Sequence, residues 1–300
     1  MSSESAATAG SAEAAEIPVG VAGAESGKQL LIWCCLALGA ILFAFAPLLR
    51  QLPRLWWFDQ DQSYYSHGSV VPLCAAFIVW DRWPRIKSIP VRGSNWAVAP
   101  GLLLIGFMWM SLRSEMNSLM SIDLVLALLC TTWFVAGWAW VKALLVPIGY
   151  LLLGLPAFNV VIDRFTPPLQ QMSASLAFKM LQLVGQNPLH GEGTVIYLNN
   201  YSMNVVEACS GLKTLLAVTA IVAFFVIVAR LRWWANVILV ALVVPLSLLV
   251  NGLRIMLIGV VGNEYGDAAA HSFHDYSGYI ALFICSVALY YLTKALGWKS

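Results

Sequence analysis

Charged residues are scarce in this 300-residue sequence, at 11% of the total against 60% hydrophobic residues. An average soluble domain carries about 25% charged residues. A soluble fold could not cover so much apolar surface, so the scarcity of charge excludes an ordinary soluble domain and indicates lipid as the solvent. The net charge of +2 says little about partners. No basic patch with interleaved aromatic residues points to nucleic acid, so we expect no nucleic-acid partner.

The six cysteines lack the spacing of a disulfide framework or of a zinc site. Five of them lie inside apolar runs, where cysteine behaves as a small hydrophobic residue. Cys209 differs, because polar residues surround it.

The N-terminus lacks the basic segment and early apolar stretch of a cleaved signal peptide. Residues 1–28 are rich in Ala, Ser, Gly and Glu, so we expect a disordered cytoplasmic tail that cannot form a packed core. Residues 29–300 are expected to form one transmembrane domain. They show no internal repeat of the kind that transporters often carry.

Apolar runs along the chain predict an all-α polytopic membrane protein with about eight transmembrane helices, since a spanning helix needs about 20 mostly apolar residues. The second run is short, and Asn251 and Arg254 interrupt the seventh, which ends at Leu249 or continues to Gly262. The candidate spans are Gln29–Leu49, Gly68–Trp80, Asn95–Leu112, Leu119–Gly137, Ala143–Phe158, Leu212–Ala229, Asn236–Leu249 and Ser277–Leu296.

The distribution of Lys and Arg predicts that both termini lie inside the cell. Short cytoplasmic loops are enriched in these residues. The segment Asp81–Ser94 carries four cations, and Arg230–Trp234 carries two. With these loops inside, the long segment 159–211 lies on the outer side of the membrane.

Two elements are predicted within that outer segment. Asp163–Gly185 has apolar residues at near-helical spacing, and Pro167 and Pro168 suit its first turn, so we expect an amphipathic helix lying on the membrane. Thr194–Leu198 and Tyr201–Val206 alternate around two asparagines, which predicts a short β-hairpin before the sixth transmembrane helix. The apolar positions of the helix are Leu169, Met172, Leu176, Met180 and Leu183.

The first polar cluster surrounds Cys209, where the sixth helix begins. A helix N-terminus and a nearby cation both favour the thiolate, and Lys213 lies one turn further along the same face. A thiolate attacks carbonyl groups, so Cys209 is a candidate nucleophile. Glu207 could orient a base or bind substrate. The plain alternatives are a buried inert thiol and a wetted interfacial carboxylate.

The second cluster is Asn251 and Arg254, which share a helical face at the expected outer end of the seventh helix. An arginine inside a bilayer costs about 2.5–3.5 kcal/mol on insertion scales, so it is a functional candidate by default. Its planar guanidinium suits an oxyanion or a carboxylate. The alternative is an interfacial arginine that reaches the headgroups.

The third cluster, His271 to Gly278, is expected in the loop just before the eighth helix. Histidine is the usual general base near neutral pH, while the alternative is a solvated loop histidine. A zinc site formed with His190 or Cys209 lacks the His-Glu-x-x-His pattern, so we expect no metal. A nucleophile, a base and a fixed cation on one side of the membrane form the set needed for acyl transfer through a thioester.

With these residues in place, the sequence resembles the exosortase/archaeosortase family of membrane transpeptidases from roughly Leu30 to Leu296. The motifs that carry the resemblance match in order and in position at helix ends. They are Tyr65-Ser66-His67-Gly68, Leu155-Pro156, Leu169-Gln170, Ala208-Cys209-Ser210-Gly211-Leu212, Asn251-x-x-Arg254 and His274-x-x-x-Gly278.

The resemblance implies a catalytic trio of Cys209, Arg254 and His274, with Cys209 as the nucleophile, Arg254 as the stabiliser of developing charge and His274 as the general base and acid. His274 is preferred to His271 because only His274 has a glycine four residues later. Lys213 stands where many members have Arg, which keeps the charge. His67 belongs to a family motif and receives no definite role.

The resemblance further implies a bacterial inner-membrane enzyme without a cofactor, with its active site on the outer face. Its substrates would be exported proteins of the PEP-CTERM kind, whose C-terminal signal has a short motif, a transmembrane helix and a basic cluster. Two alternatives remain open. One is a small-solute transporter, for which Asp123 and Asn251 are weak candidates. The other is a non-catalytic assembly protein for envelope polysaccharide.

Overall fold

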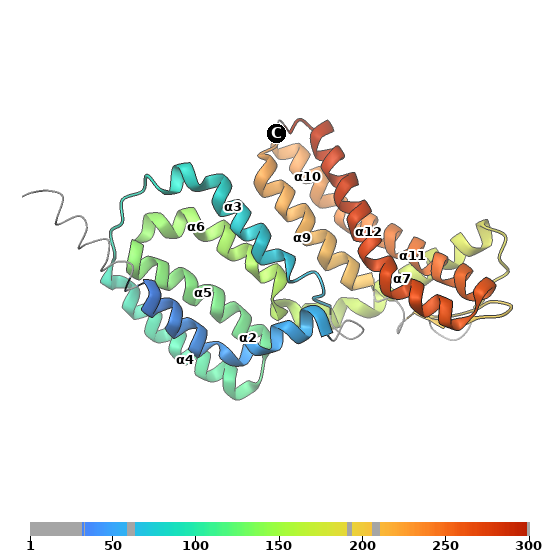
Figure 1. Ribbon diagram of the computed structural model, residues 1–300, viewed down its shortest axis with the longest axis horizontal. Helices are drawn as coiled ribbons and strands as arrows, with labels where there is room; N and C mark the ends of the chain where they lie inside the picture. The colour runs from blue at the N-terminus through green and yellow to red at the C-terminus, as the bar shows by residue number, and fades with distance from the viewer. Residues whose placement is uncertain (1–31, 33, 59–63, 191–193, 206–210, 299–300) are drawn as a thin grey trace, which may run out of the picture.

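The structure is a computed structural model, and it describes residues 32, 34–58, 64–190, 194–205 and 211–298. Within these residues the chain is mostly helical, and two groups of helices lie side by side (Figure 1). Exposed leucine and phenylalanine side chains, such as Leu103 and Phe283, cover the outer surfaces of both groups, as expected for helices in contact with lipid.

The first group comprises a helix at Cys34–Ala44 and the elements that follow it as far as η4. Its core is built around Phe45, Leu48, Met120 and Leu124. The elements are α2 (Ala46–Pro53), η1 (Arg54–Phe58), α3 (Val70–Ile86), η2 (Asn95–Ala97), α4 (Val98–Ser114), α5 (Asn117–Ala136), α6 (Trp138–Tyr150), η3 (Leu151–Gly154) and η4 (Pro156–Phe158).

The second group comprises α7 (Asn159–Leu183), α9 (Gly211–Ala229), α10 (Trp233–Ala241), α11 (Val243–Tyr265) and α12 (Asp267–Ala295). It also holds a three-stranded antiparallel sheet of β1 (Leu189–His190), β2 (Val195–Tyr197) and β3 (Ser202–Asn204), in that order. The two groups meet where α3 and α6 pack against α9, and the Tyr150 hydroxyl donates a hydrogen bond of 2.9 Å to the carbonyl oxygen of Ala220.

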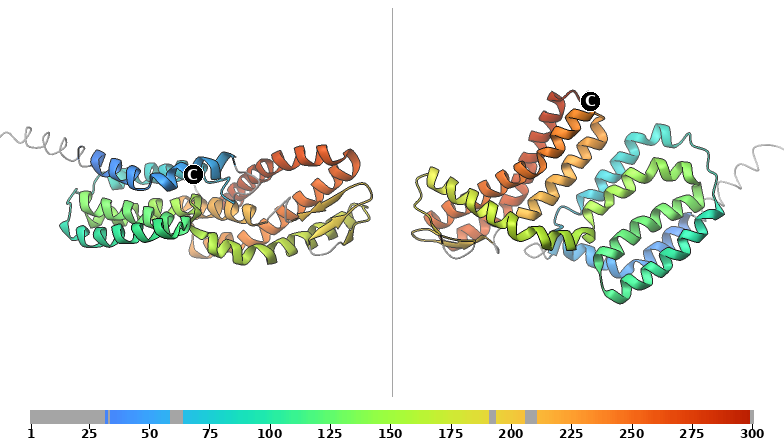
Figure 2. Two further views of the ribbon diagram at one scale, coloured as in Figure 1. Left: turned by 90° about the horizontal axis from the view of Figure 1, so that it is seen from below. Right: turned by 180° about the vertical axis from the view of Figure 1, so that it is seen from behind.

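A cap forms where α7 and the sheet pack against the ends of α11 and α12, and the left view of Figure 2 shows these four elements together at one end of the molecule. Its core includes Ala177 and Leu181 from α7, Met203 from β3 and Ile255 from α11. The cap therefore holds together the elements that carry two of the three polar clusters.

The predicted fold class is confirmed: the protein is helical and multi-pass, with the β2–β3 hairpin at the predicted place. Strand β1 was not predicted. Among the described residues, five helices are long and apolar enough to span a membrane, or up to seven if each of two bent pairs is one span. The remaining predicted span corresponds to α3, which has 17 residues and is shorter than the other candidate helices. The inside position of the termini remains a prediction.

Several predicted helix boundaries are wrong. The first span is not one straight helix, because the chain bends by 72° between Cys34–Ala44 and α2, where Pro47 occupies the first turn. The fifth begins at Trp138 and not at Ala143. The amphipathic helix begins at Asn159, so Pro167 and Pro168 lie inside α7 and not in its first turn.

The seventh predicted span had two possible ends, Leu249 and Gly262. Because α11 continues to Tyr265, the end at Leu249 is wrong and the longer alternative is close to the observed end. The predicted start of the eighth helix is wrong. The eighth begins ten residues before Ser277, because Asp267 and three alanines form a strongly helical first turn. Gly266 joins the two helices alone, with a φ of 85° in the left-handed region that favours glycine.

Candidate active site

The first residue of α9, Gly211, packs closely between α7 and α11. A Cβ atom at Gly211 would lie 2.8 Å from the Ser173 hydroxyl oxygen and 3.1 Å from the Asn251 amide nitrogen. Real Cβ atoms do not approach other atoms closer than 3.0 Å, so only glycine fits here without a shift. This packing fixes the helix end that follows Cys209. Cys209 itself and Glu207 lie outside the described residues.

Two fully buried polar side chains face this helix end. Ser173 and Asn251 are each 0% exposed, and the Ser173 hydroxyl and both polar atoms of the Asn251 amide lack a hydrogen-bond partner among the described residues. A buried polar group without a partner costs about 1–3 kcal/mol, so these two side chains require an explanation. Both side chains lie beside Gly211, which follows Cys209 by two residues in the sequence.

Arg254 ties α11 to α12. Its Nε donates a hydrogen bond of 2.9 Å to the Ser277 hydroxyl oxygen, and its Nη2 donates one of 2.8 Å to the carbonyl oxygen of His274. The Ser277 hydroxyl also donates to that carbonyl at 3.1 Å. Gly278 packs against the guanidinium, because a Cβ atom there would lie 3.7 Å from its central carbon.

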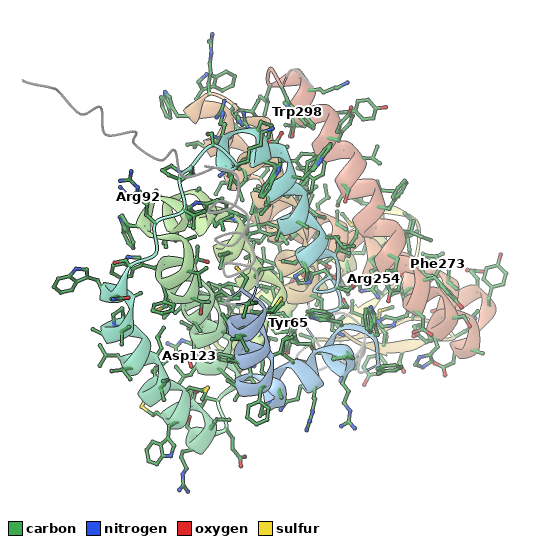
Figure 3. All side chains as sticks on the ribbon, turned by 60° about the vertical axis from the view of Figure 1, so that its left-hand side comes forward. Tyr65, Arg92, Asp123, Arg254, Phe273 and Trp298 are labelled. Carbon is green, nitrogen blue, oxygen red and sulfur yellow. The ribbon has the colours of Figure 1, made fainter. Side chains whose placement is uncertain are left out.

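The structure thus brings Arg254 together with the helical turn that bears His274. Arg254 lies in the second group of helices, close to Phe273 on α12, while Asp123 and Arg92 lie in the first group (Figure 3). Both predicted positions need correction. Arg254 and Asn251 lie in the middle of α11 and not at its end, and His271 and His274 lie inside α12 and not in a loop.

The two histidines of α12 differ in exposure. The His274 side chain is 19% exposed, and its Nδ1 lies 3.5 Å from a carboxylate oxygen of Asp275. The His271 side chain is 75% exposed and lies 3.7 Å from Asp267. His274 is therefore the less exposed of the two and has the more restricted side chain, which suits a positioned general base.

A cavity of about 530 Å³ opens beside His274. Strand β3 forms one wall and the first turns of α12 form the other. The lining residues are Tyr201, Ser202, Met203, Asn204, Ile258, Asp267, Ala270, His271, His274 and Asp275. His274 therefore borders a hollow between the sheet and α12.

His67 lies in the turn before α3. Its Nε2 is 3.1 Å from the carbonyl oxygen of Leu153, so Nε2 carries the proton and donates. Its Nδ1 is buried and lacks a partner among the described residues. Burial lowers the pKa of His67 to about 4, so the ring is neutral. His67 lines an apolar cavity of about 460 Å³ between α3, α9 and α12.

Two further residues complete the comparison with the sequence. Lys213 is half-buried in the first turn of α9. Ser173 was not identified from the sequence, although its spacing to Ala177 gives the small-residue pattern typical of close helix packing. Among the described residues, no three His, Cys, Asp or Glu side chains group as metal ligands.

The fold and the polar site together define the class of this chain: it is a multi-pass helical membrane protein with polar side chains gathered in its second group of helices. A family model described as transmembrane exosortase (Exosortase_EpsH) matches residues 56–291, so the chain belongs to this family. Searches of curated proteins and of solved structures gave no match. Family membership implies a cysteine-type sorting transpeptidase whose substrates are PEP-CTERM proteins.

Proposed function

We propose that this chain is an integral-membrane cysteine protease and transpeptidase that cleaves the C-terminal sorting signal of exported proteins. Cys209 is the nucleophile, His274 the general base and acid, and Arg254 the stabiliser of the transition state. The observation that carries the proposal is the pair of hydrogen bonds from Arg254 to the turn that bears His274. These bonds join a fixed cation and a partly buried imidazole in one rigid unit.

The proposed reaction has two acyl transfers. The Cys209 thiolate attacks the scissile carbonyl carbon, and the C–N bond then breaks as His274 gives a proton to the leaving amine. An acceptor nucleophile then attacks the carbonyl carbon of the thioester and its proton passes to His274. The C–S bond breaks and releases the Cys209 thiolate. A guanidinium has five N–H donors, of which Arg254 uses two on α12, so others can face the oxyanion.

The supporting residues have roles that follow from their positions. Ser173 and Asn251 lie beside Gly211 and lack hydrogen-bond partners among the described residues, which supports a role for them in binding the segment that carries Cys209. Lys213, one turn after Cys209, and the N-terminus of α9 both favour the thiolate. Glu207 and His67 remain candidates for substrate contact. The site is proposed to lie on the outer face of the bacterial inner membrane.

The experiment co-expresses the chain with an exported protein that carries the sorting signal and follows its cleavage. The variants Cys209→Ala, Arg254→Ala and His274→Ala should each abolish processing while the folded protein remains in the membrane. Cys35→Ala and His271→Ala are matched controls at exposed positions and should process normally. Full processing by Cys209→Ala would overturn the proposal and favour a non-catalytic assembly role.

The transporter alternative has less support. Its two candidate polar residues lie in different groups of helices, Asp123 on α5 and Asn251 on α11. Substrate uptake into proteoliposomes that survives Cys209→Ser would favour it.

A further inference from the structure

A second charged site lies at the end of the bundle where α3 and α9 end and α6 begins. We call it the basic pocket, a hollow of about 380 Å³. Its lining combines four cations with three apolar side chains. The lining residues are Arg82, Arg85, Ile86, Ile89, Lys142, Ala143 and Arg230. None of them belongs to the proposed active site.

The charges of the basic pocket are not balanced within the described part of the chain. Arg230 pairs with Asp81 at 2.6 Å. Arg82, Arg85 and Lys142 have no carboxylate within ion-pair distance among the described residues. Like charges gathered in one hollow repel each other, so the pocket favours an anion that binds several cations together.

The pocket is also held in shape before anything binds. Arg82 donates a hydrogen bond of 3.4 Å to the carbonyl oxygen of Ile227, and Arg230 has a φ of 48°, which is unusual for a residue other than glycine. The indole of Trp140 donates to the carbonyl oxygen of Ile89 at 3.3 Å. These contacts come from α3, α6 and the end of α9, so the rim is set by three helices.

The surroundings indicate which anion fits. Trp83 on α3 and Trp138 on α6 are exposed near the pocket, and Leu145 and Val146 continue an exposed apolar surface along α6. Tryptophan is enriched where a membrane meets water. The cations thus lie at headgroup depth beside a surface that acyl chains can cover, and basic pockets between transmembrane helices bind anionic headgroups.

We propose that the basic pocket binds the headgroup of an anionic phospholipid, with Arg82, Arg85 and Lys142 contacting its phosphate. The guanidinium groups match phosphate oxygens in a planar, two-point arrangement. This site is independent of the proposed peptidase function, because it uses no residue of that site.

The test uses the purified full chain in detergent and native mass spectrometry, with titrations of dioleoyl phosphatidylglycerol, dioleoyl phosphatidylcholine and inorganic phosphate. The wild type should retain phosphatidylglycerol in preference to phosphatidylcholine. Each neutralised cation should weaken phosphatidylglycerol binding about fivefold, and the triple variant Arg82→Gln/Arg85→Gln/Lys142→Gln roughly a hundredfold. Phosphate that competes as well as the lipid would overturn a lipid ligand in favour of a soluble anion.

A matched control removes three cations at the opposite end of the helices. Arg50, Arg54 and Arg113 lie near Asn117, where α5 begins, while the loop beside the basic pocket bonds to Ala136, where α5 ends. The variant Arg50→Gln/Arg54→Gln/Arg113→Gln should keep the lipid preference, and equal losses in both triple variants would contradict the proposal. If the first triple variant does not fold, Lys142→Gln alone decides, because Lys142 is exposed and a fivefold loss is measurable.

Discussion

Gly211 is the residue on which the geometry of the site depends most. Alanine there would place a methyl group 2.8 Å from the Ser173 hydroxyl oxygen and 3.1 Å from the Asn251 amide nitrogen, so these buried side chains must turn or the helices must move. We expect Gly211→Ala to destabilise the protein by about 1–3 kcal/mol, as overpacking does, and to slow processing at least tenfold. Thermal unfolding and the cleavage rate measure the two effects.

The control for this prediction is Gly106→Ala on α4, where an added Cβ meets no atom within 4 Å. That variant should be as stable as the wild type or more stable, because alanine favours a helix. Normal processing by Gly211→Ala would contradict the close packing at the start of α9.

His67 gives a prediction about pH. Burial lowers its pKa to about 4 in the folded protein, whereas an unfolded histidine titrates near 6.5. Between these pH values the unfolded chain binds more protons than the folded one. The contribution of His67 to the free energy of unfolding is therefore fully present above pH 6.5 and is lost as the pH drops toward 4. The loss reaches about 3 kcal/mol. As the pH drops from 6.5 to 4, the unfolding temperature of the wild type should decrease more than that of His67→Asn.

The exposed His271 provides the comparison, since His271→Asn should leave the pH dependence of unfolding as in the wild type. Parallel pH profiles for the wild type and His67→Asn would contradict the burial of His67.

Sequence reasoning found residues of the site but not their contacts. Arg254, His274 and Asn251 stand out because polar residues are rare in an apolar chain. Their contacts depend on how α7, α11 and α12 turn toward one another, which no single segment encodes. Ser173 was missed for the same reason: a serine in a polar outer segment looks ordinary until α7 buries it against α9 and α11.

At the scale of whole elements, the coupling of α11 to α12 depends on the shape of the Arg254 side chain and not only on its charge. Lysine keeps the charge but cannot bond Ser277 and the His274 carbonyl oxygen with separate nitrogens. A hydrogen bond to a charged group contributes about 1.5–3 kcal/mol, so Arg254→Lys should reduce processing at least tenfold. Initial cleavage rates at equal amounts of folded protein measure this.

Arg113→Lys, a change of the same kind at an exposed position on α4, should have no effect on the rate. An Arg254→Lys variant with the wild-type rate would show that a point charge suffices and that the two bonds to α12 do not matter.

The elements were predicted better than their ends. Apolar runs identified each predicted span as helical, and alternation identified the β2–β3 hairpin. The start of α12 was misplaced, and the end of α11 was left open between Leu249 and Gly262, because hydropathy falls where a helix leaves the membrane although its hydrogen bonds continue. In α11 the helix passes Asn251 and Arg254 without a break, since α7, α9 and α12 cover its polar residues.

At the scale of the whole molecule, the two groups of helices are joined by a buried polar contact as well as by apolar packing. The Tyr150 hydroxyl on α6 donates to the carbonyl oxygen of Ala220 on α9. Tyr150→Phe should cost about 1 kcal/mol of stability, because the carbonyl loses its extra partner. Tyr291→Phe, at a side chain that is 66% exposed, should have no measurable effect on thermal unfolding.

The central claim concerns the whole reaction, which places an acyl group on Cys209 between cleavage and transfer. The most direct measurement quenches the enzyme with acid during turnover and maps the peptide that contains Cys209 by mass spectrometry. The expected result is an adduct at Cys209 with the mass of the substrate fragment before the cleavage point, lost on treatment with hydroxylamine and missing in Cys209→Ala. Complete processing with no adduct on Cys209, or with the adduct on another residue, would contradict the claim.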